Sequence, residues 1–104
     1  MNDREHIRLM SEYGADWPLF GDEGETDPTL LGVSAELATR LRAWQEHFER
    51  HFHHEHGWRA PEHATAYTEE GLLLHRLLTA EIGRRADVEL ILWPALPTQQ
   101  DPQR

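Results

Sequence analysis

The stretch at residues 34–54, SAELATRLRAWQEHFERHFHH, decides the fold. Its large apolar residues recur at helical spacing, which places them on one face of an α-helix; they are Leu37, Leu41, Trp44, Phe48 and Phe52. Ser34 stands just before this pattern and is a favourable N-cap residue. We therefore predict a helix over about residues 34–54 that buries Trp44 and Phe48 in the core.

A second helix is predicted after a short connection. Pro61 suits the first turn of a helix, and Gly83 suits its end. A second apolar stripe lies between them, made of Ala64, Tyr67, Gly71, Leu74, Leu78 and Ile82. The two helices should therefore form a helical hairpin.

Strands are predicted at both ends of this hairpin. Residues 5–10, EHIRLM, alternate polar and apolar side chains, which indicates a short strand at 6–10. Residues 87–94, DVELILWP, are rich in strand-forming residues and closed by Pro94, so we predict a strand at 87–93. The two strands should pair with each other. A free sheet edge would remain, which makes a homodimer a reasonable expectation.

The segment between the first strand and the first helix is predicted to be a loop. It is aromatic over residues 11–20, SEYGADWPLF, and acidic over residues 21–28, GDEGETDP. The acidic part lacks the ligand spacing of an EF-hand, so it should be a solvated loop. The fold class is α+β, in the order β-α-α-β, with a single domain at 1–96 and a flexible tail at 97–104.

Composition excludes several classes of function. The chain has 104 residues, no cysteine, and 19 acidic against 10 basic residues, for a formal charge of −9. Such a charge repels nucleic-acid phosphates and suits a basic protein partner. No apolar run is long enough for a membrane span, and the charged N-terminus does not resemble a secretory signal. We expect a cytoplasmic protein.

The basic residues of the chain are all arginine, which is typical of a GC-rich bacterial genome.

Histidines crowd into residues 47–56, HFERHFHHEH. On the predicted helix, His47 and His51 are one turn apart and His54 continues the same row. Such a pair is half of a zinc or nickel site and needs further ligands. The alternatives are a solvated polar face and a pH-responsive cluster. The zincin pattern HExxH is absent, so no metalloprotease is indicated.

Aromatic residues in the first loop and after the last strand are candidates for partner binding. They are Tyr13, Trp17, Phe20 and Trp93. Tryptophan and tyrosine often anchor protein interfaces, although the same residues could instead form a lid over a small core. No catalytic residues are predicted, because the chain has no cysteine, no nucleophile elbow and no phosphate-binding glycine loop.

The segments YGADWPLF, LRAWQEHFERHF and VELILWP together resemble a group of small uncharacterised bacterial proteins, mainly from actinomycetes. These proteins share a Tyr-Gly-x-x-Trp-Pro-Leu-aromatic segment and a helical Leu-x-x-Trp-x-x-x-Phe core. The resemblance covers about residues 6–93 and implies no activity, ligand or catalytic residue.

The sequence therefore favours a non-enzymatic, acidic protein-binding module without a cofactor. An antitoxin or an immunity-like inhibitor belongs to this class. The alternative is a protein that binds a divalent metal through histidines, or senses metal or pH through them.

Overall fold

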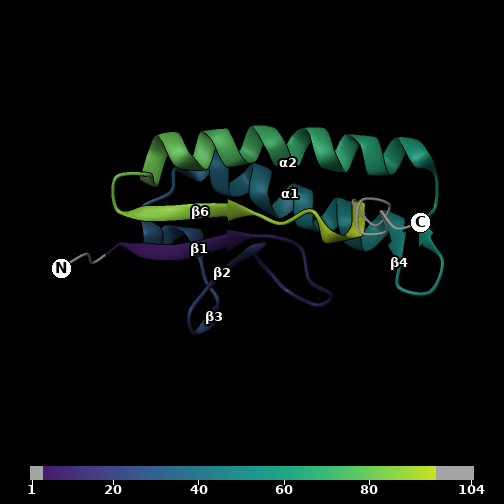
Figure 1. Cartoon of the computed structure of the whole chain (residues 1–104), viewed down its shortest axis with the longest axis horizontal. Coiled ribbons are helices and arrows are strands. Elements are labelled where there is room, and N and C mark those ends of the chain that lie inside the picture. The colour runs from purple at the N-terminus through teal and green to yellow at the C-terminus, as the bar shows by residue number, and fades with distance from the viewer. Residues whose placement is uncertain (1–3, 96–104) are drawn as a thin grey trace, which may run out of the picture.

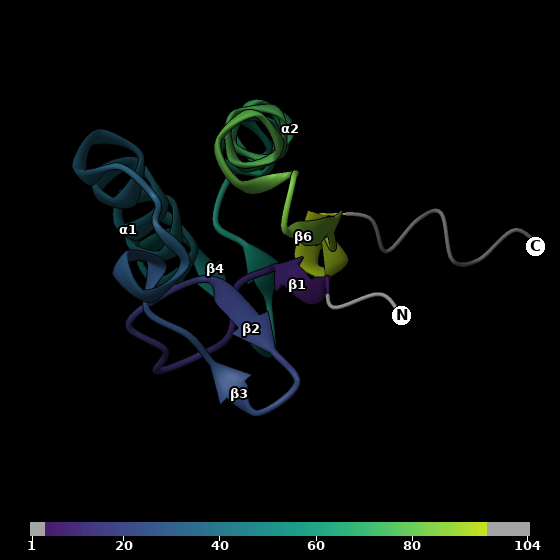
Figure 2. The same cartoon turned by 90° about the vertical axis from the view of Figure 1, so that its left-hand side faces the viewer.

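The computed structural model describes residues 4–95, and in this range two helices lie on one face of a four-stranded mixed sheet (Figures 1 and 2). The elements follow in the order β1 (Glu5–Leu9), β2 (Leu19–Gly21), β3 (Gly24–Glu25), η1 (Pro28–Leu31), α1 (Ala35–His51), β4 (Phe52–His53), β5 (Gly57–Trp58), α2 (Pro61–Ile82), β6 (Ala86–Leu90) and η2 (Trp93–Ala95). The predicted α+β class is confirmed. The predicted tail at 97–104 lies outside the described residues.

The sheet has the strand order β3-β2-β1-β6. β1 and β6 pair in parallel, from Glu5 opposite Ala86 to Leu9 opposite Leu90, so the predicted pairing of the first and last strands is confirmed. A parallel pair needs a crossover connection. Here both helices belong to that connection and cover one face, as Figure 2 shows. The side chains of β1 alternate accordingly, with Ile7 and Leu9 buried beneath the helices.

Helix α1 begins where predicted and ends earlier than predicted. The Ser34 hydroxyl accepts a hydrogen bond from the backbone N–H of Leu37 at 3.2 Å and caps the helix. The helix ends at His51, and Phe52 is extended, with φ −117° and ψ 130°. Residues 52–58 instead form the β4–β5 hairpin, in which Phe52 pairs with Trp58 and His53 with Gly57. His54 therefore does not continue the helical row of His47 and His51.

Helix α2 runs from Pro61 to Ile82 and confirms both predicted ends. It packs against α1 through the two predicted stripes. The indole of Trp44 stacks on the ring of Tyr67, with centroids 4.4 Å apart, and its Nε1 donates a hydrogen bond to the Tyr67 carbonyl. Trp44 and Phe48 are buried, as predicted.

One core joins the helices to the sheet. Its buried members include Ile7, Leu9, Leu19, Leu37, Leu41, Trp44, Phe48, Tyr67, Leu74, Leu78, Ile82, Ala86 and Leu92. The described residues contain no helix that is long and apolar enough to cross a bilayer.

The predicted loop between the first strand and the first helix contains a small hairpin. Residues 19–25 form β2 and β3, in which Phe20 pairs with Glu25 and Gly21 with Gly24. Gly24 has a φ of 109°, which a residue with a side chain rarely adopts. At the other end of the chain, β6 stops at Leu90, and Trp93 lies in η2 rather than in the last strand.

Candidate functional site

Aromatic side chains gather at the end of the molecule where α1 meets the β4–β5 hairpin. Tyr13 packs on Phe48 and Phe52 at 5.1 and 6.3 Å between ring centroids. Trp93 packs on the same two rings at 5.7 and 5.4 Å. We call these four residues the aromatic end. Phe48 is buried, whereas Tyr13 and Trp93 remain 46% and 38% exposed, so both present ring surface to solvent.

Hydrogen bonds hold the indole of Trp93 and the loop that carries Tyr13 in place. The indole Nε1 of Trp93 donates to the carbonyl of buried Ser11 at 2.9 Å. The loop carrying Tyr13 is fixed to α1, because Gln45 donates to the Glu12 carbonyl at 2.6 Å and the Gly14 N–H donates to Glu49 at 3.1 Å. Gly14 permits this turn with a φ of 80°. The aromatic end is therefore a preorganised apolar surface.

The two other predicted partner-binding residues lie elsewhere. Trp17 is half-buried beneath the guanidinium of Arg42, which lies 4.4 Å from the ring centroid. Phe20 is half-buried on β2, opposite Arg8 of β1. The structure thus brings Tyr13 and Trp93 together, and leaves Trp17 and Phe20 outside this cluster.

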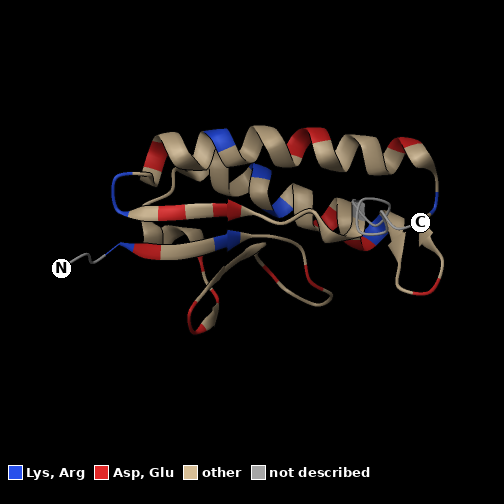
Figure 3. Ribbon diagram, viewed as in Figure 1, with Lys and Arg blue, Asp and Glu red and all other residues tan. Residues whose placement is uncertain are grey.

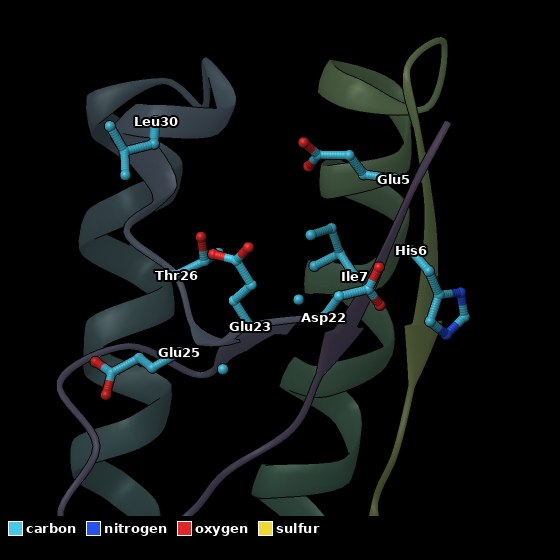
Figure 4. A pocket seen from close by; sticks show the side chains of 10 residues that line it. Glu5, His6, Ile7, Asp22, Glu23, Glu25, Thr26 and Leu30 are labelled. Atoms are coloured by element: carbon cyan, nitrogen blue, oxygen red, sulfur yellow. The ribbon is translucent and has the colours of Figure 1, made fainter. Parts of the chain in front are cut away.

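An acidic pocket lies between β1, the β2–β3 hairpin and η1 (Figure 4). Its volume is about 500 Å³, and its lining includes the acidic residues Glu5, Asp22 and Glu23 beside Ile7 and Leu30. Glu25 also borders the pocket, but its carboxylate points away and accepts hydrogen bonds from the backbone N–H groups of Asp16 and Trp17. Leu30 is 80% exposed. The sequence indicated an acidic loop here. It did not indicate the pocket, because the pocket forms only when the short hairpin folds beside β1.

Acidic residues also occur on several other elements. Figure 3 shows them on β1, β6, the β2–β3 turn and α2. Part of this charge is paired with arginine: Arg40 bonds Glu70 at 2.9 Å, and Arg4 bonds Asp87 at 2.6 Å. The formal charge of −9 nevertheless leaves a surface that favours a basic partner.

Three histidines meet where α1 ends and α2 begins. The rings of His47 and His51 are 4.6 Å apart on α1, and His63 of α2 stacks on His51 at 3.7 Å. Burial and the neighbouring His63 and His47 lower the pKa of His51. The sequence did not indicate that His63 belongs to this cluster, because His63 meets His51 only through the packing of the two helices.

Four further side chains crowd into the turn of the β4–β5 hairpin. The rings of His54 and His56 each lie 4.7 Å from that of His53. The Glu55 carboxylate lies 3.7 Å from Nε2 of His54 and 4.0 Å from Nε2 of His56. His54 also contacts Tyr13 at 6.0 Å between ring centroids, so the hairpin adjoins the aromatic end.

The buried hydroxyl groups of Tyr67 and Ser11 bond each other, whereas Oε1 of buried Gln45 has no hydrogen-bond partner among the described residues. The Tyr67 hydroxyl donates to the Ser11 hydroxyl at 2.9 Å, and burial raises the pKa of Tyr67. Ser11 is fully buried, so it cannot meet a substrate as a nucleophile. The arrangement can bind another protein through an apolar surface that is flanked by the exposed residues Glu12 and Glu49.

Comparison with known proteins supplies the family. None of the curated proteins compared with the chain matches it. The sequence model of the Serratia CdiI immunity protein-like family matches residues 5–91. The match covers nearly the same range as the resemblance described above, and all of the strands and helices from β1 to β6.

CdiI immunity proteins are non-enzymatic inhibitors that bind a CdiA toxin domain, and they act in the cytoplasm. This confirms the prediction that the chain is a protein-binding module and not an enzyme. Because the match covers most of its length, the chain belongs to the Serratia CdiI immunity protein-like family.

Proposed function

We propose that the chain is an immunity protein that binds the toxin domain of its cognate CdiA protein in the cytoplasm and blocks its activity. The family match over residues 5–91 carries this proposal. Size, acidic charge and the exposed aromatic side chains support it, because each suits a small inhibitor that recognises another protein.

The aromatic end is the proposed contact surface. Interface anchors are commonly tyrosine and tryptophan side chains that pass from partial exposure to full burial on binding. Tyr13 and Trp93 are partly exposed and already fixed by their surroundings, so they would lose little conformational entropy on binding. Trp17 and Phe20 lie outside the aromatic end, so the proposed contact does not include them, and their part in partner binding stays a prediction.

Carboxylates near this surface support a basic partner. Glu12 and Glu49 flank the Tyr13 loop and are exposed. Charges at the rim of an interface accelerate association and make it sensitive to salt. A toxin domain with a basic surface would therefore associate with this end of the molecule fastest at low ionic strength.

A co-expression experiment tests the function. Cells that express the toxin domain should grow when the chain is co-expressed and should stop growing when it is absent. Failure of the folded chain to protect, together with failure to bind the toxin domain in vitro, would reject the proposed function.

A set of variants tests the surface separately. Tyr13→Ala and Trp93→Ala should each weaken toxin binding at least tenfold, as expected for interface anchors. Leu72→Ala is the matched control, because Leu72 is 50% exposed on α2, away from the aromatic end. Asp22→Asn with Glu23→Gln tests the acidic pocket. If binding is lost in the pocket variant or in Leu72→Ala, while Tyr13→Ala and Trp93→Ala bind normally, the proposed surface is wrong.

A further inference from the structure

The turn of the β4–β5 hairpin carries metal-ligand chemistry that toxin recognition does not use. One ligand atom from each of His53, Glu55 and His56 lies within 4.8 Å of the other two. Two donors on one ion lie at most about 4.4 Å apart, since each bond is about 2.0–2.2 Å long, so small rotations of these side chains would bring all three donors onto a single ion.

The backbone holds this turn in a defined shape. β4 and β5 pair through Phe52 with Trp58 and through His53 with Gly57, and Gly57 takes a φ of 77°. The hairpin is fastened to the core by the edge-to-face contact of Phe52 and Trp58 at 5.1 Å. Trp58 also donates a hydrogen bond to the Pro94 carbonyl at 2.9 Å. The three ligands are therefore carried by a short, anchored element, which reduces the cost of organising them around an ion.

We propose that His53, Glu55 and His56 form a divalent-metal site for which zinc is the expected ion. Two imidazoles and one carboxylate are a ligand set that zinc accepts, with water in the fourth position. The set contains neither thiolate nor thioether and only one carboxylate. This disfavours copper(I), magnesium and calcium. The site goes beyond the proposed immunity function and does not depend on it.

Binding of an ion would exchange one hydrogen bond of this turn. Metal binding needs a neutral imidazole ring with a lone pair on the nitrogen that faces the ion. The Glu55 N–H lies 3.0 Å from Nδ1 of His53. An ion on Nε2 requires the proton of that ring on Nδ1, so this hydrogen bond would be exchanged for the metal bond.

The helical histidines are a poorer set. Nε2 of His47 lies 3.0 Å from the carbonyl oxygen of His63, which can only accept, so this nitrogen carries a hydrogen and only Nδ1 of His47 is left to bind an ion. The rings of His51 and His63 stack at an interplanar angle of 14°, so their lone pairs lie in nearly parallel planes and do not converge. Within residues 4–95, the hairpin trio is the group of three with ligand atoms this close.

Calorimetric titration of the whole, tag-free chain with zinc chloride tests the proposal. We expect one equivalent of zinc to bind with micromolar affinity and to raise the melting temperature. His53→Gln with His56→Gln should weaken binding at least tenfold, and so should Glu55→Gln. All three side chains lie on a surface turn, and circular dichroism will check that the variants remain folded.

The matched control is His47→Gln with His51→Gln, which should bind zinc as the parent does. Loss of binding in this control, with full binding in the hairpin variants, would move the site to α1 and overturn the proposal. Millimolar or non-stoichiometric binding by the parent would also overturn it, as adventitious binding only. These outcomes do not depend on whether the chain binds a toxin domain.

Discussion

At the scale of single residues, the packing of the Trp44 indole against α2 depends on Gly71. A Cβ atom at this position would lie 2.9 Å from Cζ2 of Trp44 and 3.0 Å from Cδ2 of Leu92. The indole cannot move aside easily, because it is stacked on Tyr67 and hydrogen-bonded to the backbone. The smallest possible residue is therefore required at this point of the helix pair.

We predict that Gly71→Ala destabilises the fold, although alanine is the better helix former. Overpacking a core costs typically about 1–3 kcal/mol, against about 1 kcal/mol gained from helix propensity, so the net loss should be up to about 2 kcal/mol. Urea denaturation followed by circular dichroism measures it. Ala80→Gly, on the exposed side of the same helix, reports the propensity alone and should lose about 1 kcal/mol. An equally stable or more stable Gly71→Ala protein would show that the helices can separate at no cost.

At the scale of elements, the free edge of β6 is covered by side chains. The carbonyl oxygens of Ala86 and Val88 face away from β1, where a further strand would pair with them. The guanidinium of Arg4 donates to the first at 2.9 Å, and Nε2 of His75 donates to the second at 2.7 Å. Covered acceptors make this edge a poor template for another strand. The homodimer stays a prediction, and pairing through β6 would first have to break these bonds.

His75→Ala should therefore lower stability and promote self-association. The loss of one hydrogen bond costs about 0.5–1.5 kcal/mol, and the exposed Val88 carbonyl becomes available to a second chain. Light scattering over a concentration series, with a thermal melt, measures both effects. His75→Gln is the control, because its amide can still donate. Monodisperse His75→Ala protein with the parent's melting temperature would mean that His75 does not protect this edge.

The ends of β1 and β6 should respond to acid through Asp87. Hydrogen bonds from Arg4 lower the pKa of Asp87 in the folded chain. Because its pKa is lower in the folded chain, ionised Asp87 stabilises the fold at pH values above its unfolded-state pKa of about 4. This stabilisation disappears as the pH falls through the folded-state pKa.

Thermal melts at pH 7 and in steps below pH 4 test this dependence with Asp87→Asn. The variant should melt below the parent at pH 7, and the difference should shrink as the pH falls. Asp22→Asn on the β2–β3 turn is the comparison and should show a smaller difference at pH 7. A difference for Asp87→Asn that stays constant down to the lowest pH would contradict the assigned role.

The elements that could be predicted from sequence are those with strong local patterns. Pro61 and Gly83 set both ends of α2, and alternation in residues 5–10 located β1. The end of α1 was predicted three residues too late, because Phe52 fits the helical spacing and leaves the helix only to pair with Trp58. The strands β2 and β3 are too short for any periodicity to reveal.

At the scale of the whole molecule, the candidate site could be predicted only in part. Tyr13 and Trp93 were identified by residue type, but their meeting on Phe48 and Phe52 requires the parallel pairing of β1 and β6. The same limit applies to the stacking of His63 on His51 and to the acidic pocket, because each brings together residues from separate elements. Residue type can identify candidate binding residues, whereas tertiary packing determines which of these candidates lie on the same surface.

The most direct test of the account is a calorimetric titration of the whole chain with the purified toxin domain of its cognate CdiA protein. We expect saturable one-to-one binding that weakens as salt is added and is reduced at least tenfold by Tyr13→Ala with Trp93→Ala. In the same mixtures, toxin activity should fall in proportion to the complex formed. A folded parent chain that shows no heat of binding at several temperatures, and leaves the toxin fully active at micromolar concentration, would contradict the account.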